Sequence, residues 1–378
     1  MARTLVVTND FPPKQGGIEN FVYQLVSRLP PEEVVVFTSS SPGAAEFDAT
    51  LPFPVIRART GTLLPTPHIT RGAATLIERF GCDSVYFGAA ASLGLMAARL
   101  RHIPGVRRLV GSSHSHECFW TKALPTRRAL HGIGEGLDCM TYISDYCGEV
   151  IGRALSPAAR ARMTRLSPGV EPSQFWPPAD PAPVRAQFGL AGRPVILNVS
   201  RLVPHKGQDT LIKALPLVLA AVPDAVSLIV GAGPERERLA RLAARSGVDD
   251  AVRFAGPVPH AALAPFYAAA DVFAFPTRDR TMGLQVEGLG MVSLEAQAAG
   301  LPVVVGSSGG APETVRSGVT GYAVGSSDVP GLAGRLVELL SDPVRARAMG
   351  EAGRAWMAAD WAWAPRAALL RRLLRPAV

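Results

Sequence analysis

The chain has few lysines, few cysteines and no long hydrophobic run. Its 39 basic residues include only four lysines, so a lysine beside a predicted ligand site is a stronger signal than an arginine. The four cysteines form no Cys-x-x-Cys pair and predict free thiols in a reducing compartment. No apolar run reaches the roughly 18 residues of a membrane-spanning helix, and the apolar start is too short for a signal peptide, so we expect a cytoplasmic protein.

Charged residues are also sparse, at 19% of the 378 positions, whereas apolar residues make up 48%. This composition can fill the cores of two domains and excludes a disordered chain. The net charge of +8 suits anionic partners, but no basic run or aromatic-basic interleaving indicates nucleic acid. The densest basic cluster fits either a solvated helix face or contact with an acidic membrane surface. It consists of Arg371, Arg372 and Arg375.

Strand and helix patterns alternate along the chain, which predicts an α/β fold with parallel sheets covered on both faces. A proline-rich stretch separates two series of the same class, so we expect two domains joined by a hinge near 170–185. Open parallel sheets bind ligands at the carboxyl ends of their strands, and two facing domains would enclose a cleft. The expected strands are 5–8, 34–37, 84–87, 108–111, 194–200, 227–230, 252–254, 272–275 and 302–305.

A candidate anion-binding motif follows the first strand of each series. Gly16 and Gly17 precede a helix, where free N–H groups suit an anion, although glycine pairs also serve plain turns. Arg201 and Lys206 lie five residues apart between a strand and a helix. Two cations in a cleft need an anion to pair with them, and a diphosphate fits. A surface loop of an arginine-rich protein is the alternative.

The segment 286–297 carries the strongest signal, with two glutamates eight residues apart. Gly288 and Gly290 make a tight loop that holds Glu287, and Glu295 lies about one turn into the following helix. Carboxylates accept hydrogen bonds from the hydroxyls of a ribose or a sugar, and free N–H groups at a helix start receive phosphate or sugar oxygens. One such segment can therefore hold both ends of a nucleotide sugar.

A second glycine-rich turn, with Gly231 and Gly233, resembles the start of the G-x-G-x-x-G motif of dinucleotide-binding proteins. The third glycine of that motif would fall at Arg236, so the pattern fails. A tight strand-to-helix turn is the better interpretation, and the pattern indicates a nucleotide contact only weakly.

These motifs resemble the retaining glycosyltransferases of the GT-B fold over essentially the whole chain. The segments 9–13, 200–204, 286–290, 294–297 and 308–315 resemble, more narrowly, the actinobacterial GDP-mannose-dependent mannosyltransferases of phosphatidylinositol mannoside synthesis. The resemblance implies two Rossmann-like domains that face a central cleft. They are 1–168, completed by a C-terminal helix at 360–378, and 169–359. It also implies transfer of mannose from GDP-mannose to a glycolipid acceptor at the inner membrane face.

The resemblance implies a role for each motif. Arg201 and Lys206 would stabilise the departing nucleoside diphosphate, Glu287 would hold the donor sugar, and Glu295 would hold the ribose. His114 would contact the donor sugar near the reacting carbon. The expected donor-binding residues are Gly16, Gly17, Gly231, Arg253, Gly288, Leu289, Gly290, Met291, Val292 and Glu295.

The chain contains no Asp-x-Asp, the motif with which many transferases hold a metal against the diphosphate. The two cations would replace that metal, so we expect a retaining, metal-independent enzyme without a cofactor. A metal site of His114, His116 and Glu117 is the competing interpretation.

Other functions remain open from the sequence. One is a secondary-metabolite glycosyltransferase that uses a GDP or UDP sugar and a soluble cyclitol acceptor. The others are a nucleotide-sugar epimerase and a non-catalytic nucleotide-binding module. Three tryptophans near the C-terminus fit either membrane anchors or the packing of a last helix against the first domain. They are Trp356, Trp361 and Trp363.

Overall fold

A computed structural model describes residues 3–176, 178–280 and 285–375, and the chain divides into two compact units. The first unit is Met1–Pro168 together with Trp363–Val378, and the second is Gly169–Ala362. The final helix, α16 (Trp363–Leu374), belongs to the first unit and begins later than the expected position 360. Residues 376–378 of that expected helix lie outside the described residues.

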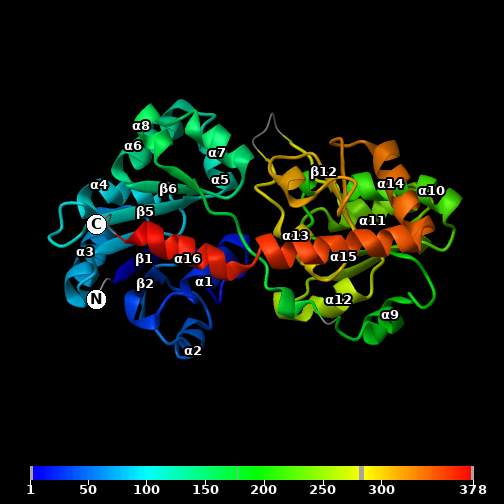
Figure 1. The fold of residues 1–378 in the computed structure, drawn as a ribbon, viewed down its shortest axis with the longest axis horizontal. Helices are drawn as coiled ribbons and strands as arrows, with labels where there is room; N and C mark the ends of the chain where they lie inside the picture. The colour runs from blue at the N-terminus through cyan, green and yellow to red at the C-terminus, as the bar shows by residue number, and fades with distance from the viewer. Residues whose placement is uncertain (1–2, 177, 281–284, 376–378) are drawn as a thin grey trace. The chain divides into compact units, whose positions relative to one another are not determined.

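The first unit is built on a seven-stranded sheet whose strands all run parallel (Figure 1). The strand order is β3-β2-β1-β4-β5-β6-β7. Strands β2 and β3 are therefore added on one side of β1, and β4 to β7 on the other side. The two central strands β1 and β4 are buried throughout, which explains their continuous apolar runs. The strands are β1 (Thr4–Thr8), β2 (Val34–Ser39), β3 (Val55–Ala58), β4 (Ser84–Phe87), β5 (Arg108–Ser113), β6 (Cys139–Tyr142) and β7 (Met163–Arg165).

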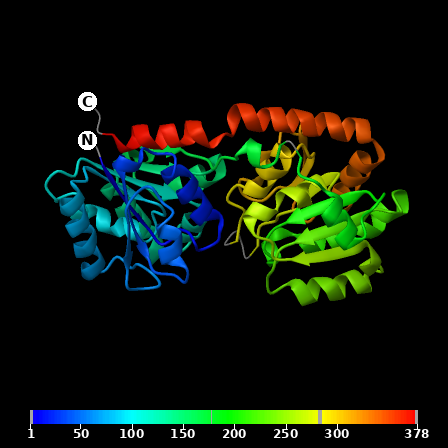
Figure 2. The same ribbon diagram turned by 90° about the horizontal axis from the view of Figure 1, so that it is seen from below.

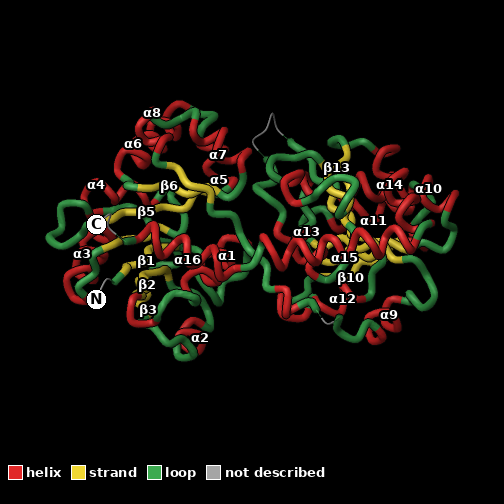
Figure 3. Tube along the Cα trace, in the orientation of Figure 1, coloured by secondary structure: helices red, strands yellow, loops and turns green. Residues whose placement is uncertain are grey.

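Helices enclose this sheet, as the tube in Figure 3 shows. The longest, α3, begins at Pro67 behind a Thr66 side chain that accepts a hydrogen bond from the Ile69 amide, and it ends at the left-handed Gly81. The helices of the first unit are α1 (Gly17–Val26), α2 (Ala44–Asp48), α3 (Pro67–Phe80), α4 (Ala97–Leu100), α5 (Ser115–Trp120), α6 (Leu124–Gly136), α7 (Asp145–Gly152), α8 (Pro157–Ala161) and α16, with 3₁₀ turns η1 (Pro31–Glu33) and η2 (Leu93–Met96).

The second unit is built on a six-stranded parallel sheet in the order β10-β9-β8-β11-β12-β13. Its first strand, β8, is again central. Strands β9 and β10 are added on one side of β8 and β11 to β13 on the other, so the strand order reverses between β8 and β11. Ligands of doubly wound sheets bind beside such a reversal, at the carboxyl ends of the strands. The strands are β8 (Val195–Val199), β9 (Val226–Val230), β10 (Val252–Gly256), β11 (Val272–Phe275), β12 (Val303–Gly306) and β13 (Gly321–Val324).

The helices of the second unit pack on both faces of its sheet. Leu211, Leu215 and Val218 of α10 lie in one buried cluster with Leu332 and Leu336 of α14. The helices are α9 (Ala182–Phe188), α10 (Gln208–Ala221), α11 (Arg236–Arg245), α12 (Ala264–Ala268), α13 (Met291–Ala298), α14 (Val329–Ser341) and α15 (Pro343–Asp360), with 3₁₀ turns η3 (Pro172–Gln174), η4 (Pro204–Lys206), η5 (Asp249–Ala251), η6 (His260–Ala262) and η7 (Ala311–Thr314).

The C-terminal tryptophans take part in packing rather than facing solvent. Trp363 is 3% exposed and meets Phe21 of α1 edge-on, while α16 lies along the sheet of the first unit (Figure 2). Trp361 is buried against Trp356 in the second unit. Arg371 is ion-paired with Glu33, so the C-terminal arginine cluster is partly neutralised within its own unit. None of the described helices is long and apolar enough to span a membrane.

Candidate active site

The loop after β8 carries the two predicted diphosphate-binding cations. It runs from Arg201 through the turn η4 to Gly207, which adopts a left-handed conformation and begins α10. A Cβ on Gly207 would lie 1.8 Å from the Pro276 carbonyl oxygen, so only glycine allows the loop to pack against the end of β11. The Arg201 side chain is exposed and forms no ion pair with a described residue, whereas Lys206 turns inward.

Lys206 and Glu287 form a close pair that joins two predicted motifs. The Lys206 Nζ donates to Glu287 Oε2 at 2.5 Å, and their side chains are 15% and 11% exposed. The Nζ also lies 5.0 Å from the centre of the Phe275 ring, where a cation is attracted to the π face. A lysine so held is a fixed, partly desolvated positive charge at the carboxyl edge of the sheet.

Further cations converge on this loop around His205. The pKa of His205 is lowered to about 4, first by burial and then by the charges of Lys206, Arg201 and Arg278, against the opposing effect of Glu287. Arg278 itself donates to Asp209 and Thr210 at the start of α10, which fixes it beside the loop. Burial and the positive potential at this edge therefore together keep His205 neutral.

A glycine turn after β12 supports Glu287 from behind. The Glu287 amide donates to Ser308 Oγ at 3.1 Å, and the Gly310 amide donates to the Glu287 carbonyl at 2.9 Å. A Cβ on Gly309 would lie 2.0 Å from that carbonyl oxygen, so the two chains touch backbone to backbone. The Ser308 hydroxyl in turn donates to Asp279 at 2.6 Å. The segment 308–315 was part of the predicted resemblance without a role of its own. The structure shows that its first residues position Glu287.

The predicted loop after Glu287 ends in a left-handed turn that starts α13. Gly288, Leu289 and Gly290 are buried, and Gly290 precedes the first helical residue, Met291, at φ 97°. Met291 and Val292 are half-buried at the helix start, where amides have no helical acceptor. The loop and the helix start thus bring N–H groups to the same edge as Lys206 and Glu287.

Glu295, the predicted ribose-binding residue, is held by two donors. Tyr267 donates its hydroxyl to Glu295 Oε2 at 2.8 Å, and His260 Nε2 lies 2.9 Å from Oε1. The hydrogen bond to Glu295 raises the pKa of His260 above its ordinary value. A carboxylate has about four lone-pair sites, so two remain for further hydroxyls. Neither partner could be recognised from the sequence, because each lies far from Glu295 along the chain.

Two predicted donor-binding residues make structural contacts within the second unit. Arg253 lies at the amino end of β10, where its guanidinium donates to the main-chain carbonyls of Phe188, Asp250 and Val252. That position, at the edge opposite the cations, argues against a contact with the base. Gly231 adopts a φ of +135°, and a Cβ there would lie 2.0 Å from the Ser200 carbonyl oxygen, so this glycine serves a close backbone crossing.

In the first unit, Gly16 directly precedes α1 and Gly17 is its first residue, at the carboxyl edge of the sheet. Gly17 is exposed, and a Cβ there would meet no other atom within 4 Å. A Cβ on Gly16 would lie 2.2 Å from Glu19 Oε2. A carboxylate therefore already lies over the helix start, where an anion is stabilised.

His114 begins α5 at the end of β5 and is 4% exposed. Its Nε2 lies 2.9 Å from the Gly88 carbonyl oxygen, so Nε2 must carry the proton, and Phe21 meets the ring edge-on at 5.1 Å. Burial lowers the pKa of His114 to about 4, which keeps the imidazole neutral at physiological pH. A neutral, fixed imidazole at this edge suits positioning better than proton transfer.

Two carboxyl groups accompany His114 at the same edge. Glu117 is fully buried and accepts from the amides of His114 and Ala91, while burial raises its pKa to about 7. Burial and the nearby Glu19 raise the pKa of Asp10 to about 6. Asp10 was not among the predicted site residues. Its position two residues after the first strand is nevertheless typical of a ligand-binding residue in a parallel sheet.

The competing metal site at this edge is not formed. The Glu117 carboxylate faces main-chain amides and His114 Nε2 faces a carbonyl, so they do not converge with His116. Within 3–176, 178–280 and 285–375, no three or more side chains of the metal-binding types come together.

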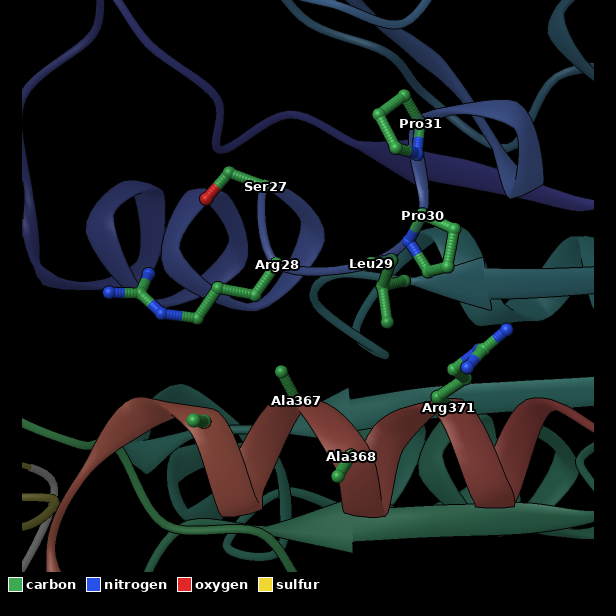
Figure 4. A pocket seen from close by; sticks show the side chains of 9 residues that line it. Ser27, Arg28, Leu29, Pro30, Pro31, Ala367, Ala368 and Arg371 are labelled. Atoms are coloured by element: carbon green, nitrogen blue, oxygen red, sulfur yellow. The ribbon is translucent and has the colours of Figure 1, made fainter.

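Two cavities lie away from these edges. One of about 550 Å³ lies between the end of α1 and α16, lined by Leu29, Pro30, Pro31 and Ala367 among others (Figure 4). The other, of about 520 Å³, is lined by residues that directly precede β8, β11 and β12. Both lie at the amino ends of strands, where parallel sheets do not place their ligand sites.

Two family models together match most of the chain. The model described as Glycosyltransferase Family 4 matches residues 15–174, and the one described as Glycosyl transferases group 1 matches residues 183–356. HepE from Anabaena, solved with UDP-glucose, superimposes with a TM-score of 0.82 at 20% identity, covering 98% of this chain and 99% of that one. This likeness confirms the predicted GT-B fold.

Two curated relatives match nearly the full length. The GDP-mannose-dependent alpha-(1-6)-phosphatidylinositol monomannoside mannosyltransferase of Mycolicibacterium smegmatis is 44% identical over 375 residues, 98% of this chain and 97% of the relative. The enzyme named for the monoacylated form of that acceptor in Corynebacterium glutamicum is 44% identical over 366 residues, 96% and 94% of the two chains. These matches confirm the resemblance and exclude the epimerase. The chain therefore belongs to the same family of GT-B glycosyltransferases as these phosphatidylinositol monomannoside mannosyltransferases.

Proposed function

We propose that the protein transfers mannose from GDP-mannose to a hydroxyl of a phosphatidylinositol mannoside, with retention of configuration, at the inner face of the membrane. The observation that carries the proposal is the buried Lys206–Glu287 pair within a cluster of cations at the carboxyl edge of the second sheet. The acceptor class is supported by relatives that are 44% identical over nearly the whole chain.

The cations would act on the leaving group. Negative charge grows on the diphosphate as the glycosidic bond breaks, and preorganised cations stabilise that charge most in the transition state. Lys206 is held by Glu287 and Phe275, so little reorganisation is needed when the charge develops. Arg201 is exposed on the same loop and would close on the diphosphate. The pair would take the place of a metal, so we expect the reaction to need neither a metal nor a cofactor.

The other motifs of the second unit would hold the two ends of the donor. Glu287 and the amides at the start of α13 suit the hydroxyls of the sugar and the oxygens of the diphosphate. Glu295 keeps acceptor sites free for the ribose hydroxyls, with Tyr267 and His260 fixing its orientation.

The edge of the first unit would receive the acceptor. Gly17, exposed at the start of α1, would approach the diphosphate, and His114 is a neutral, fixed group for the donor sugar. Asp10 is half-buried at this edge and suits an acceptor hydroxyl. None of the predicted motifs assigns a carboxylate the role of nucleophile. Retention would then proceed by front-face attack, in which the leaving phosphate takes the proton of the attacking hydroxyl.

The test is turnover of purified protein with GDP-mannose and phosphatidylinositol monomannoside, with a chelator present. We expect one α-linked mannose in the product, assigned by NMR, and no loss of rate in the chelator. Consumption of UDP-glucose or UDP-N-acetylglucosamine in place of GDP-mannose would refute the donor assignment. Transfer to a soluble cyclitol but not to the glycolipid would refute the acceptor assignment.

A further inference from the structure

The junction of α5 and α6 exposes apolar and basic side chains together. Phe119 is 41% exposed and Leu124 is 61% exposed, although most large apolar side chains of this unit are buried. Lys122, Arg127 and Arg128 are exposed beside them in the sequence. We call these five residues the α5–α6 patch. None of its three cations forms an ion pair with a described residue.

The outward face of α6 continues this basic character. Leu124, Arg127, Arg128 and His131 are exposed at the spacing of one helix face, whereas Leu130 and Ile133 point into the core. The sequence contains no acidic residue from 118 to 134. A helix with an apolar start and an unneutralised basic face is typical of segments that lie in the interface of an anionic bilayer.

The patch also lies close in the sequence to the carboxyl edge of the first sheet, which would receive the acceptor. His114 begins α5, and Phe119 lies in the same helix, so a short, rigid element connects the two (Figure 1). A lipid acceptor presents its sugar to the enzyme while its acyl chains stay in the bilayer. The enzyme must therefore meet the bilayer near the edge that receives the sugar.

The C-terminal arginine cluster, the other candidate for membrane contact, is less suited. Arg371 and Arg375 both pair with Glu33, and α16 buries its apolar side against the first unit. Its charges are partly neutralised, and in the described part of α16 no leucine is exposed beside them, since Leu369 and Leu373 are half-buried.

We propose that the α5–α6 patch binds the surface of an anionic lipid bilayer, with Phe119 and Leu124 entering the interface and the three cations meeting lipid phosphates. Each basic residue near an anionic surface and each buried apolar side chain adds to the partition coefficient. The inference rests on the proposed function for the acceptor being a lipid, but binding to a bilayer requires no catalysis and is measured separately.

The test is co-sedimentation of the full chain with vesicles of phosphatidylcholine alone or of phosphatidylcholine and phosphatidylserine in equal parts. We expect binding only to the anionic vesicles and a decline of binding with salt. The variants Phe119→Ser/Leu124→Ser and Lys122→Gln/Arg127→Gln/Arg128→Gln should each lower the partition coefficient by about tenfold or more. Circular dichroism and donor hydrolysis in the absence of vesicles should be unchanged, because the patch lies outside the proposed catalytic residues.

The matched control is Val344→Ser/Arg347→Gln, which removes an exposed apolar and an exposed basic residue from α15 of the second unit. Its binding should equal that of the wild type. Equal binding to neutral vesicles, or wild-type binding by both patch variants, would overturn the inference. So would a dimer that the patch variants dissociate without any vesicle binding. Vesicle binding without mannosyl transfer would instead refute the proposed function and leave the inference standing.

Discussion

The carboxyl edges of the two sheets have opposite electrostatic character. In the second unit, burial together with the charges of Lys206, Arg201 and Arg278 lowers the pKa of the half-buried His205 to about 4. In the first unit, burial and neighbouring carboxylates raise the pKa of Asp10 to about 6 and that of Glu117 to about 7. The two sheets share the parallel, doubly wound plan, so this difference comes from the loops alone.

This difference suggests that the diphosphate leaving group binds to the second unit and the acceptor hydroxyl to the first. An edge rich in cations stabilises a diphosphate, whereas an edge with neutral or weakly acidic groups suits hydroxyls. The same fold can therefore bind the charged leaving group at one edge and the uncharged nucleophile at the other. Variants of the two edges should accordingly fail in different assays.

The largest effect is expected from Lys206→Ala. Loss of a preorganised charge at a developing diphosphate should lower kcat about 100- to 1000-fold, both for transfer and for donor hydrolysis. Lys213→Ala, which removes an exposed lysine from α10, is the control and should retain the wild-type rate. Steady-state kinetics with GDP-mannose measure both. Full kcat in Lys206→Ala would contradict the assignment of the leaving-group site.

A smaller and more selective effect is expected from Asp10→Asn. If this carboxylate holds the acceptor hydroxyl, transfer should fall about 10- to 100-fold, as for the loss of a hydrogen bond to a charged group. The affinity for GDP, measured by calorimetry, should be unchanged because the diphosphate site belongs to the other edge. A parallel loss of GDP affinity would remove the distinction between the two edges.

The two edges should also respond to pH with opposite signs. Asp10 binds its proton more tightly in the folded protein, so its contribution to stability falls as pH rises from about 4 to 6. Asp10→Asn should therefore raise the free energy of unfolding by about 1–3 kcal/mol above pH 6 and have little effect below pH 4.

His205 should behave in the reverse way, because its pKa is lower in the folded protein and its contribution falls as pH drops from 6.5 to about 4. His205→Gln should gain stability over the wild type in that acidic window and not at neutral pH. Urea unfolding at about pH 4.5 and 7.5 measures both variants. Parallel pH profiles would contradict the electrostatic comparison.

The smallest effect is expected from His260→Ala. Glu295 would keep its bond to Tyr267, so the KM for GDP-mannose should rise only about threefold, with kcat nearly unchanged. The wild-type KM should also rise with pH above 6.5, because the raised pKa of His260 means that its charge is lost there. A variant that kept this pH dependence would show that another group causes it.

The fold class and most central strands could be predicted from the sequence. The continuous apolar runs at β1, β8 and β11 mark strands buried on both faces, and the structure has them within a residue or two of the expected bounds. The missed strands lie toward the sheet edges. β3 is only half-buried, β6 is short and lacks a run of branched residues, and β13 begins with a glycine. Their pairing depends on the neighbouring strand more than on local propensity.

The site could be predicted only in part. Lys206 and Glu287 stood out because a rare lysine and a glycine-flanked glutamate each follow a strand, and the structure joins them. The partners of Glu295 and the Ser308 support of Glu287 could not be found, because they act across long stretches of chain. The contacts of Arg253 with main-chain carbonyls could not be foreseen either, because one of its partners, Phe188, lies 65 residues away in the chain.

By itself, the sequence determined the class of fold and the strand-to-helix turns that carry the chemistry, and its motifs resemble one family. The fold class and the turns follow from local spacing and composition, since a buried run and the turn after it are adjacent in the chain. Only the tertiary structure decided which charges meet. Side chains 81 residues apart, such as Lys206 and Glu287, come together because parallel strands bring successive loops to one edge. The same packing decides which arginines are neutralised and which, such as Arg127 and Arg128, form no ion pair with a described residue.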